Sequence, residues 1–315
     1  MAQDLESLGY SGRAVAHKLI DQINFIRLRA ITSVASRAFS GVWENAEIET
    51  EIPGVGVSIA SLFRQIKKVV GLEPTRITGA VVRDEEQIHV TVRISGETSE
   101  TINGELNSLD KILLKASEHV YRVIQPYILA AYQYQFDKQA SLDTVKLIIS
   151  KEPATDDPPA FILWGLILAD QGDHEGAITK YKEAIELDPT YALSYNNWGV
   201  ALANQGDYEG AIAKYEKAIQ LDPTNALPYS NWGLNLAHQT DNEGAIITKY
   251  EKAITKYKRA IELDPTNALS YINWGAALAN QGDYEGAIAK YKTAIKLDPD
   301  EVGSKAQSLI NQLRR

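Results

Sequence analysis

The chain has 315 residues, of which 44% are hydrophobic and 23% are charged, and its formal net charge is −9. This length suggests about two domains. The acidic balance, without a block of lysine or arginine, argues against nucleic acid as a partner. The sequence contains no cysteine, which excludes a disulfide framework, a thiol nucleophile and a thiolate metal site.

Membrane and export signals are also missing from the sequence. No segment approaches the roughly 18 uninterrupted apolar residues of a membrane-spanning helix. The first residues, MAQDLESLGYSGRAV, lack the charged and apolar regions of a secretory signal. We therefore expect a cytoplasmic protein.

Residues 1–45 are predicted to form an amphipathic helical region. Apolar residues recur at helical spacing with basic residues between them; they are Val15, Leu19, Ile23, Ile26, Ile31 and Val34. In one interpretation this stripe packs on the neighbouring domain. In the other it contacts lipid or a partner helix.

Residues 46–125 are predicted to form a small α+β domain. Period-two alternation marks strands near residues 48–52, 77–82 and 88–94. One helix is expected to be capped by Ser58 and stopped at Gly71, and another is expected over 108–125. One face of the short sheet would be covered by these two helices. Residues 83–86, Arg-Asp-Glu-Glu, would form a charged hairpin turn.

The segment Pro53-Gly54-Val55-Gly56 stands between a predicted strand and a predicted helix, where backbone amides could face a phosphate. A dinucleotide fingerprint needs a third glycine where this chain has Ile59, and no Gly-Lys-Ser or Gly-Lys-Thr follows. An ordinary strand-to-helix turn is therefore favoured, and we predict no cofactor.

The second half of the chain is periodic. Trp164, Trp198, Trp232 and Trp274 each precede a glycine, at intervals of 34, 34 and 42 residues. The prolines at positions 189, 223, 265 and 299 recur at intervals of 34, 42 and 34. The tryptophans and the prolines thus recur with the same period, which indicates a structural repeat.

Each unit is predicted to be one helical hairpin. In the second unit a first amphipathic helix ends at Gly206, which can adopt a positive φ, and Asp207 can cap a second helix that starts near Tyr208. Small residues at Ala211 and Ala218 let the two helices approach, and Pro223 ends the hairpin. An Asp at the cap and a Glu in the first turn recur in every unit and suit the helix dipole.

The sequence ALSYNNWGVALANQGDYEGAIAKYEKAIQLDPTN at 192–225 resembles the tetratricopeptide (TPR) repeat. This resemblance implies an all-α, right-handed superhelix of four units, at 158–191, 192–225, 226–267 and 268–301, with a capping helix over 302–315. Residues 126–157 would be a degenerate TPR-like helical pair. The front domain is loosely similar to N-terminal regions of bacterial TPR proteins, through its GYSG start and IPGVGVS loop.

The third unit contains eight additional residues, within a near-duplicate of ITKYEKA followed by ITKYKRA. Eight residues would lengthen the second helix by about 12 Å and turn its face by about 80°. The next unit would then tilt, or the insert would bulge. In one interpretation the insert projects and contacts a second protein or another copy of the chain. In the other it is a tolerated duplication.

In a TPR superhelix the first helices line a concave groove, and here those helices are rich in asparagine. A row of amides can bond the backbone of an extended peptide; alternatively, these amides bond between adjacent helices. The ladder Asn197, Asn231 and Asn273 is similar to that of the TPR superhelix of O-linked N-acetylglucosamine transferase. The predicted groove residues are Asn196, Asn197, Val200, Asn204, Ser230, Asn231, Asn235, His238, Ile272, Asn273 and Asn280.

The sequence offers no catalytic or metal-binding constellation. The five histidines, at positions 17, 89, 119, 174 and 238, have no ligand spacing. We therefore expect a non-enzymatic adaptor or scaffold that binds a protein or peptide in its groove, with self-association as a further role. The alternative is a regulatory or assembly module of a membrane-associated or signalling complex, in which the N-terminal helix contacts lipid or a partner.

Overall fold

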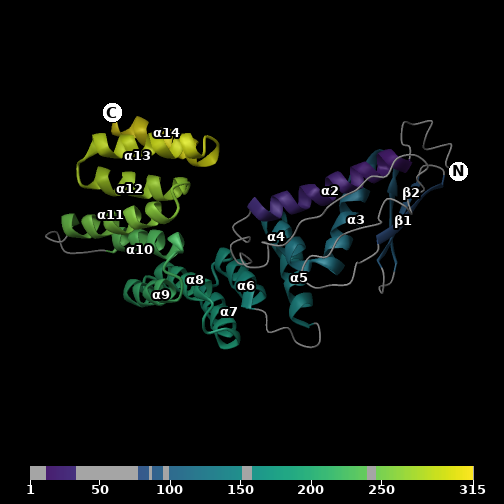
Figure 1. Cartoon of the computed structure of the whole chain (residues 1–315), viewed down its shortest axis with the longest axis horizontal. Helices are drawn as coiled ribbons and strands as arrows, with labels where there is room; N and C mark the ends of the chain where they lie inside the picture. Colours follow the sequence, from purple (N-terminus) through teal and green to yellow (C-terminus); the bar gives the residue numbers. More distant parts are fainter. Residues whose placement is uncertain are drawn as a thin grey trace. The chain divides into compact units, whose positions relative to one another are not determined.

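A computed structural model describes residues 12–32, 77–84, 87–94, 99–150, 158–239 and 246–314. The chain forms two compact units, Met1–Thr155 and Asp156–Arg315 (Figure 1). Several predicted features lie outside the described residues. These are the strand near 48–52, the glycine-containing loop 53–56, the helix over 58–71 and the turn at 85–86.

The first unit contains a three-stranded antiparallel sheet and four described helices. The strand order is β1-β2-β3, with Val81 opposite Val90 and Val90 opposite Ile102. The elements are α2 (Gly12–Thr32), β1 (Ile77–Asp84), β2 (Gln87–Ile94), β3 (Glu100–Glu105), a 3-10 turn (Leu106–Ser108), α3 (Leu109–Ile124), α4 (Pro126–Phe136) and α5 (Lys138–Ser150).

One face of the sheet is buried, because buried and more exposed side chains alternate along β2. Its even-numbered residues Ile88, Val90, Val92 and Ile94 are buried, and α3 packs against β2 and β3. The α3 helix presents Ile112, Leu113 and other apolar residues to this core. The predicted α+β arrangement is thus confirmed where the structure describes it.

The apolar stripe of α2 is used inside the first unit. Leu19, Ile23 and Ile26 are buried, and α2 packs against α3 and α4. The Tyr121 hydroxyl donates a hydrogen bond to the Ile23 carbonyl at 3.0 Å. Packing on the neighbouring helices therefore accounts for this part of the stripe.

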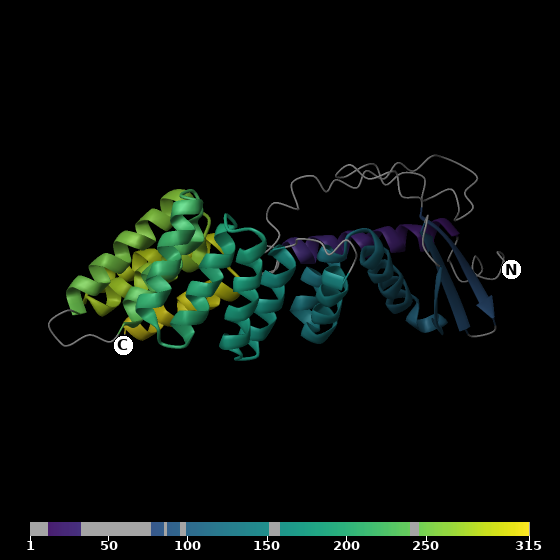
Figure 2. The ribbon, with the colours of Figure 1, turned by 90° about the horizontal axis from the view of Figure 1, so that it is seen from below.

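The second unit is a stack of helical hairpins (Figure 2), so the predicted solenoid is confirmed. Each first helix packs against the second helix of its own hairpin, and each second helix packs against the hairpin that follows. The helices are α6 (Pro158–Asp170), α7 (His174–Leu187), α8 (Ala192–Asn204), α9 (Tyr208–Leu221), α10 (Ala226–His238), α11 (Ile246–Leu263), α12 (Ala268–Asn280), α13 (Tyr284–Leu297) and α14 (Glu301–Leu313).

The hairpin core depends on a glycine facing a tyrosine. A Cβ on Gly199 would lie 2.6 Å from Cε1 of Tyr215, and one on Gly233 would lie 2.7 Å from the same atom of Tyr257. Because these glycines have no side chain, the tyrosine rings can lie directly on the first helix. At the C-terminal end of the stack α14 contributes buried Ala306 and Ile310 to the last core.

The insert of the third unit lies at the start of its second helix. Helix α11 has 18 residues, whereas α9 has 14. Ala253, Tyr257 and Ala260 are buried and correspond to Ala211, Tyr215 and Ala218 of α9. The face of α11 is therefore not rotated, because the additional residues precede the packed turns rather than interrupting them.

The turn between the two helices follows the predicted chemistry. Gly206 has a φ of 85°, and the Gly210 amide donates to the Asp207 carboxylate at 2.9 Å. We expect Asp207→Ala to lower the free energy of unfolding by about 1 kcal/mol, because the first turn of α9 loses its cap. Urea denaturation followed by circular dichroism would measure this. Asp207→Asn, which keeps the acceptor, serves as the control and should change the stability little.

Candidate functional site

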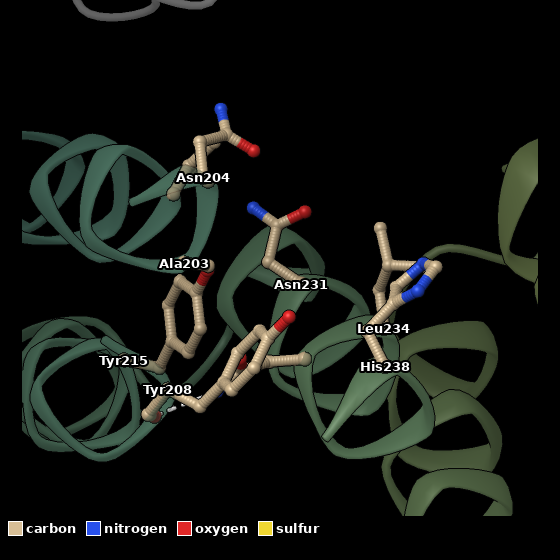
Figure 3. Close-up of a pocket in the computed structure, with 9 residues that line it drawn as sticks. Ala203, Asn204, Tyr208, Tyr215, Asn231, Leu234 and His238 are labelled. Atoms are coloured by element: carbon tan, nitrogen blue, oxygen red, sulfur yellow. Dashed lines mark hydrogen bonds between the residues drawn. The ribbon is translucent and has the colours of Figure 1, made fainter. Parts of the chain in front are cut away.

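A pocket of about 350 Å³ lies where α8, α9 and α10 meet. Figure 3 shows side chains from all three helices converging on it. Its walls combine aliphatic groups, two tyrosine rings, three amides and an imidazole. The lining residues are Val200, Ala203, Asn204, Tyr208, Tyr215, Asn231, Leu234, Asn235 and His238.

Five of the predicted groove residues line this pocket, and six do not. Those in the pocket are Val200, Asn204, Asn231, Asn235 and His238. Asn204 and His238 are exposed, whereas Asn235 is buried. The structure thus gathers the central part of the predicted set from two neighbouring units.

Asparagine side chains also connect adjacent units. The Asn231 amide on α10 donates to the Asn196 side-chain oxygen on α8 at 2.9 Å. Asn196 in turn donates to the Asn197 side-chain oxygen at 3.1 Å. Asn196 is only 3% exposed, so it is part of the scaffold. Inter-helix bonding therefore explains this part of the asparagine row.

Asn235 is held in one orientation and has one unused acceptor. Its Nδ2 donates to the Tyr208 carbonyl at 2.9 Å, which directs its Oδ1 the other way. That oxygen is buried and accepts no hydrogen bond from the described part of the chain. A buried acceptor without a donor is energetically costly.

The remaining predicted residues have other surroundings. Ser230 accepts a hydrogen bond from the Ser270 hydroxyl at 3.1 Å, which joins α10 to α12. Ile272 belongs to the core cluster of the last unit. Asn273 and Asn280, on α12, do not line the pocket.

Sequence reasoning missed Ala203, Tyr208, Tyr215 and Leu234. The two tyrosines belong to the second helix, whereas the prediction considered only first helices. Tyr215 is 1% exposed, and burial raises the pKa of its hydroxyl. Leu234 is 38% exposed and could have been found, because it lies one helical turn before the predicted His238.

The described residues contain no group of three or more histidine, aspartate or glutamate side chains placed to hold a metal ion. Within the same residues, no helix is both long enough and apolar enough to cross a bilayer.

Stacked hairpins, each closed by a glycine facing a tyrosine, define an α-solenoid repeat protein. A TPR repeat model matches residues 165–206, 201–239 and 249–282, and a tetratricopeptide repeat model matches residues 268–301. Residues 165–301 therefore consist of tetratricopeptide repeats.

Solved structures are similar to more than half of the chain. TTC0263, a thermophilic TPR protein from Thermus thermophilus, has the same fold and is 20% identical with a TM-score of 0.50, covering 60% of this chain and 96% of its own. MamA 41-end from Desulfovibrio magneticus is 21% identical with a TM-score of 0.42, covering 58% and 96%. Comparison with curated protein sequences gave no match.

Proposed function

We propose that this chain is a protein-interaction adaptor and that the α8–α10 pocket holds an extended peptide segment. Support comes from the repeat class, because TPR units are generally interaction modules without catalytic activity. The observation that carries the proposal is a pocket of about 350 Å³ in which the exposed side chains of Asn204 and His238 stand beside apolar Leu234. A peptide supplies backbone N–H and C=O groups at regular intervals, and the exposed amide of Asn204 can bond both kinds of group.

The pocket walls also suit a peptide. Val200 and Leu234 offer apolar surface for a side chain, while Asn204 and His238 lie exposed beside them and can bond peptide groups. Ligand sites commonly combine mostly apolar walls with a few well-placed polar groups. Specificity would then come from the side chain that enters between α8 and α10.

The test is to fill the pocket. Peptides selected from a random phage-displayed library against the intact chain would be labelled and measured by fluorescence anisotropy. We expect Leu234→Trp to weaken their binding by about tenfold or more, because the indole would occupy the space that a buried anchor needs.

Leu269→Trp is the matched control, since Leu269 is 47% exposed on α12 and does not line the pocket. It should leave the affinity unchanged. If the selected peptides bind the Leu234→Trp protein as tightly as the unmodified chain, the pocket is not the binding site.

A further inference from the structure

Every tryptophan of the repeats is covered by a lysine from the second helix of its own unit. The lysine Nζ atom lies 4.1 Å or less from the centre of the indole ring in all four cases. The pairs are Lys180 on Trp164, Lys214 on Trp198, Lys256 on Trp232 and Lys290 on Trp274. Such cation–π contacts stabilise an ammonium group beside an apolar surface.

Two of these tryptophans have a second lysine, from the preceding unit. Lys182 lies 5.1 Å from the ring centre of Trp198, whose own lysine is at 3.7 Å. Lys258 lies 5.6 Å from that of Trp274, whose own lysine is at 3.6 Å. We name these groups the lysine–tryptophan triads: Lys182, Trp198 and Lys214 form the first, and Lys258, Trp274 and Lys290 form the second.

Each triad brings two ammonium groups to one indole ring. None of the four lysines forms an ion pair with a carboxylate in the described part of the chain. Burial lowers the pKa of Lys214, and the nearby charge of Lys182 lowers it further. Neighbouring like charges therefore repel each other here, in a chain whose overall charge is negative.

The tryptophans add donors to the same groups. The indole N–H groups of Trp198 and Trp274 are buried and have no acceptor among the residues that the structure describes. Lysine and tryptophan side chains can only donate hydrogen bonds. Each triad therefore contains three donor side chains and no acceptor of its own.

The unit at 192–225 has a carboxylate where the units before and after it have the second lysine of a triad. At the position of Lys182 and Lys258 it has Glu216. Burial lowers the pKa of Lys256, whose ammonium lies 3.1 Å from the ring centre of Trp232, and the negative charge of Glu216 partly offsets this effect. The same framework thus accepts either a lysine or a glutamate, and a carboxylate is the favourable neighbour for the stacked lysine.

The triads are separate from the pocket. Trp198 and the pocket residue Val200 are two residues apart on α8, which places them about 200° apart around the helix. Lys182 and Lys258 are exposed, and Lys214 and Lys290 are half-buried. A molecule could therefore reach the ammonium groups while a peptide occupies the pocket.

We propose that the two lysine–tryptophan triads bind an acidic peptide segment of a partner protein, with one carboxylate placed at each triad. Charge-assisted bonds from lysine to a carboxylate are stronger than neutral ones. The carboxylate reduces the repulsion between the two lysines while the half-buried lysine stays on its indole. A long polyanion such as nucleic acid fits less well, because the net charge of −9 repels it beyond the triads.

The probe is a fluorescein-labelled oligoglutamate peptide, titrated with the full chain and followed by anisotropy at low salt. We expect saturable binding that weakens as salt shortens the Debye length from about 10 Å at 0.1 M to about 3 Å at 1 M. The double variant Lys182→Glu with Lys258→Glu should weaken binding by about tenfold. Both changes recreate the Glu216 arrangement, which this fold already contains.

The control is a second double variant with the same change of charge, placed outside the triads. Lys217→Glu with Lys296→Glu reverses two exposed lysines that lie outside both triads, and it should leave the affinity nearly unchanged. Conversely, Glu216→Lys should create a third triad and strengthen binding several-fold.

Three outcomes would overturn the proposal. The first is failure of the unmodified chain to bind oligoglutamate. The second is an equal loss of affinity in both double variants, which would indicate general charge attraction. The third is equally tight binding of a single-stranded oligonucleotide of equal charge, with the same dependence on the triad lysines, and the partner would then be nucleic acid instead.

Discussion

Tyr257→Ala should lower the free energy of unfolding by about 3–5 kcal/mol, whereas Tyr250→Ala should lower it by less than about 1 kcal/mol. The two tyrosines occupy equivalent places in the duplicated segments ITKYEKA and ITKYKRA. Only Tyr257 is fully buried, and it lies against Gly233 on α10. Removing its ring would open a cavity in the core of the third hairpin.

The comparison also tests which copy of the duplication packs. Urea denaturation followed by circular dichroism gives both free energies, with Tyr215→Ala as a reference for a unit without an insert. Equal losses for Tyr250→Ala and Tyr257→Ala would mean that α11 exchanges between two registers. A larger loss for Tyr250→Ala would show that the first copy is the packed one.

The sequence predicted the hairpins well because their signals are local and repeated. The capping of α9 by Asp207 and its start at Tyr208 follow from the chemistry of a single turn. The register of α11 did not follow, because both copies of the duplication have the same amphipathic pattern. Two features distinguish Tyr257 from Tyr250. Tyr257 lies against Gly233 on another helix, and it stands eight residues before Pro265, as Tyr215 stands eight before Pro223.

The site was predicted in part for a similar reason. Residues of the first helices were found from their spacing, but the role of each amide depends on distances between units. The hydrogen bond from Asn231 to Asn196 joins residues that are 35 positions apart. The sequence does contain a signal for the stacking of lysine on tryptophan, since a lysine recurs at a constant distance after Trp164, Trp198 and Trp274. That spacing acquires a meaning only through the packing of the two helices, which brings each lysine onto an indole.

Strongly alkaline solution should unfold the repeats steeply. Tyr181, Tyr215, Tyr257 and Tyr291 are at most 2% exposed, and burial raises the pKa of each hydroxyl above its ordinary value near 10. The folded protein therefore holds these protons more tightly than the unfolded chain. This stabilisation is complete below the unfolded pKa and is lost as the pH rises through the folded values.

The slope of the unfolding free energy against pH gives the expected size of the effect. Each tyrosine removes about 1.4 kcal/mol of stability per pH unit above about pH 10, so the four together remove about 5.6 kcal/mol per pH unit. Circular dichroism would follow the helices, and ultraviolet absorbance would follow tyrosinate formation in the same sample. The two transitions should coincide, because a buried tyrosine ionises when its hairpin opens.

Phenylalanine variants separate titration from packing. Tyr215→Phe with Tyr257→Phe keeps the rings against Gly199 and Gly233 but removes two ionisable hydroxyls. We expect the slope of stability against pH to fall by about half, since two of the four titrating groups are lost. An unchanged slope would assign alkaline unfolding to other groups, such as the loss of charge on the lysines that cover the tryptophans.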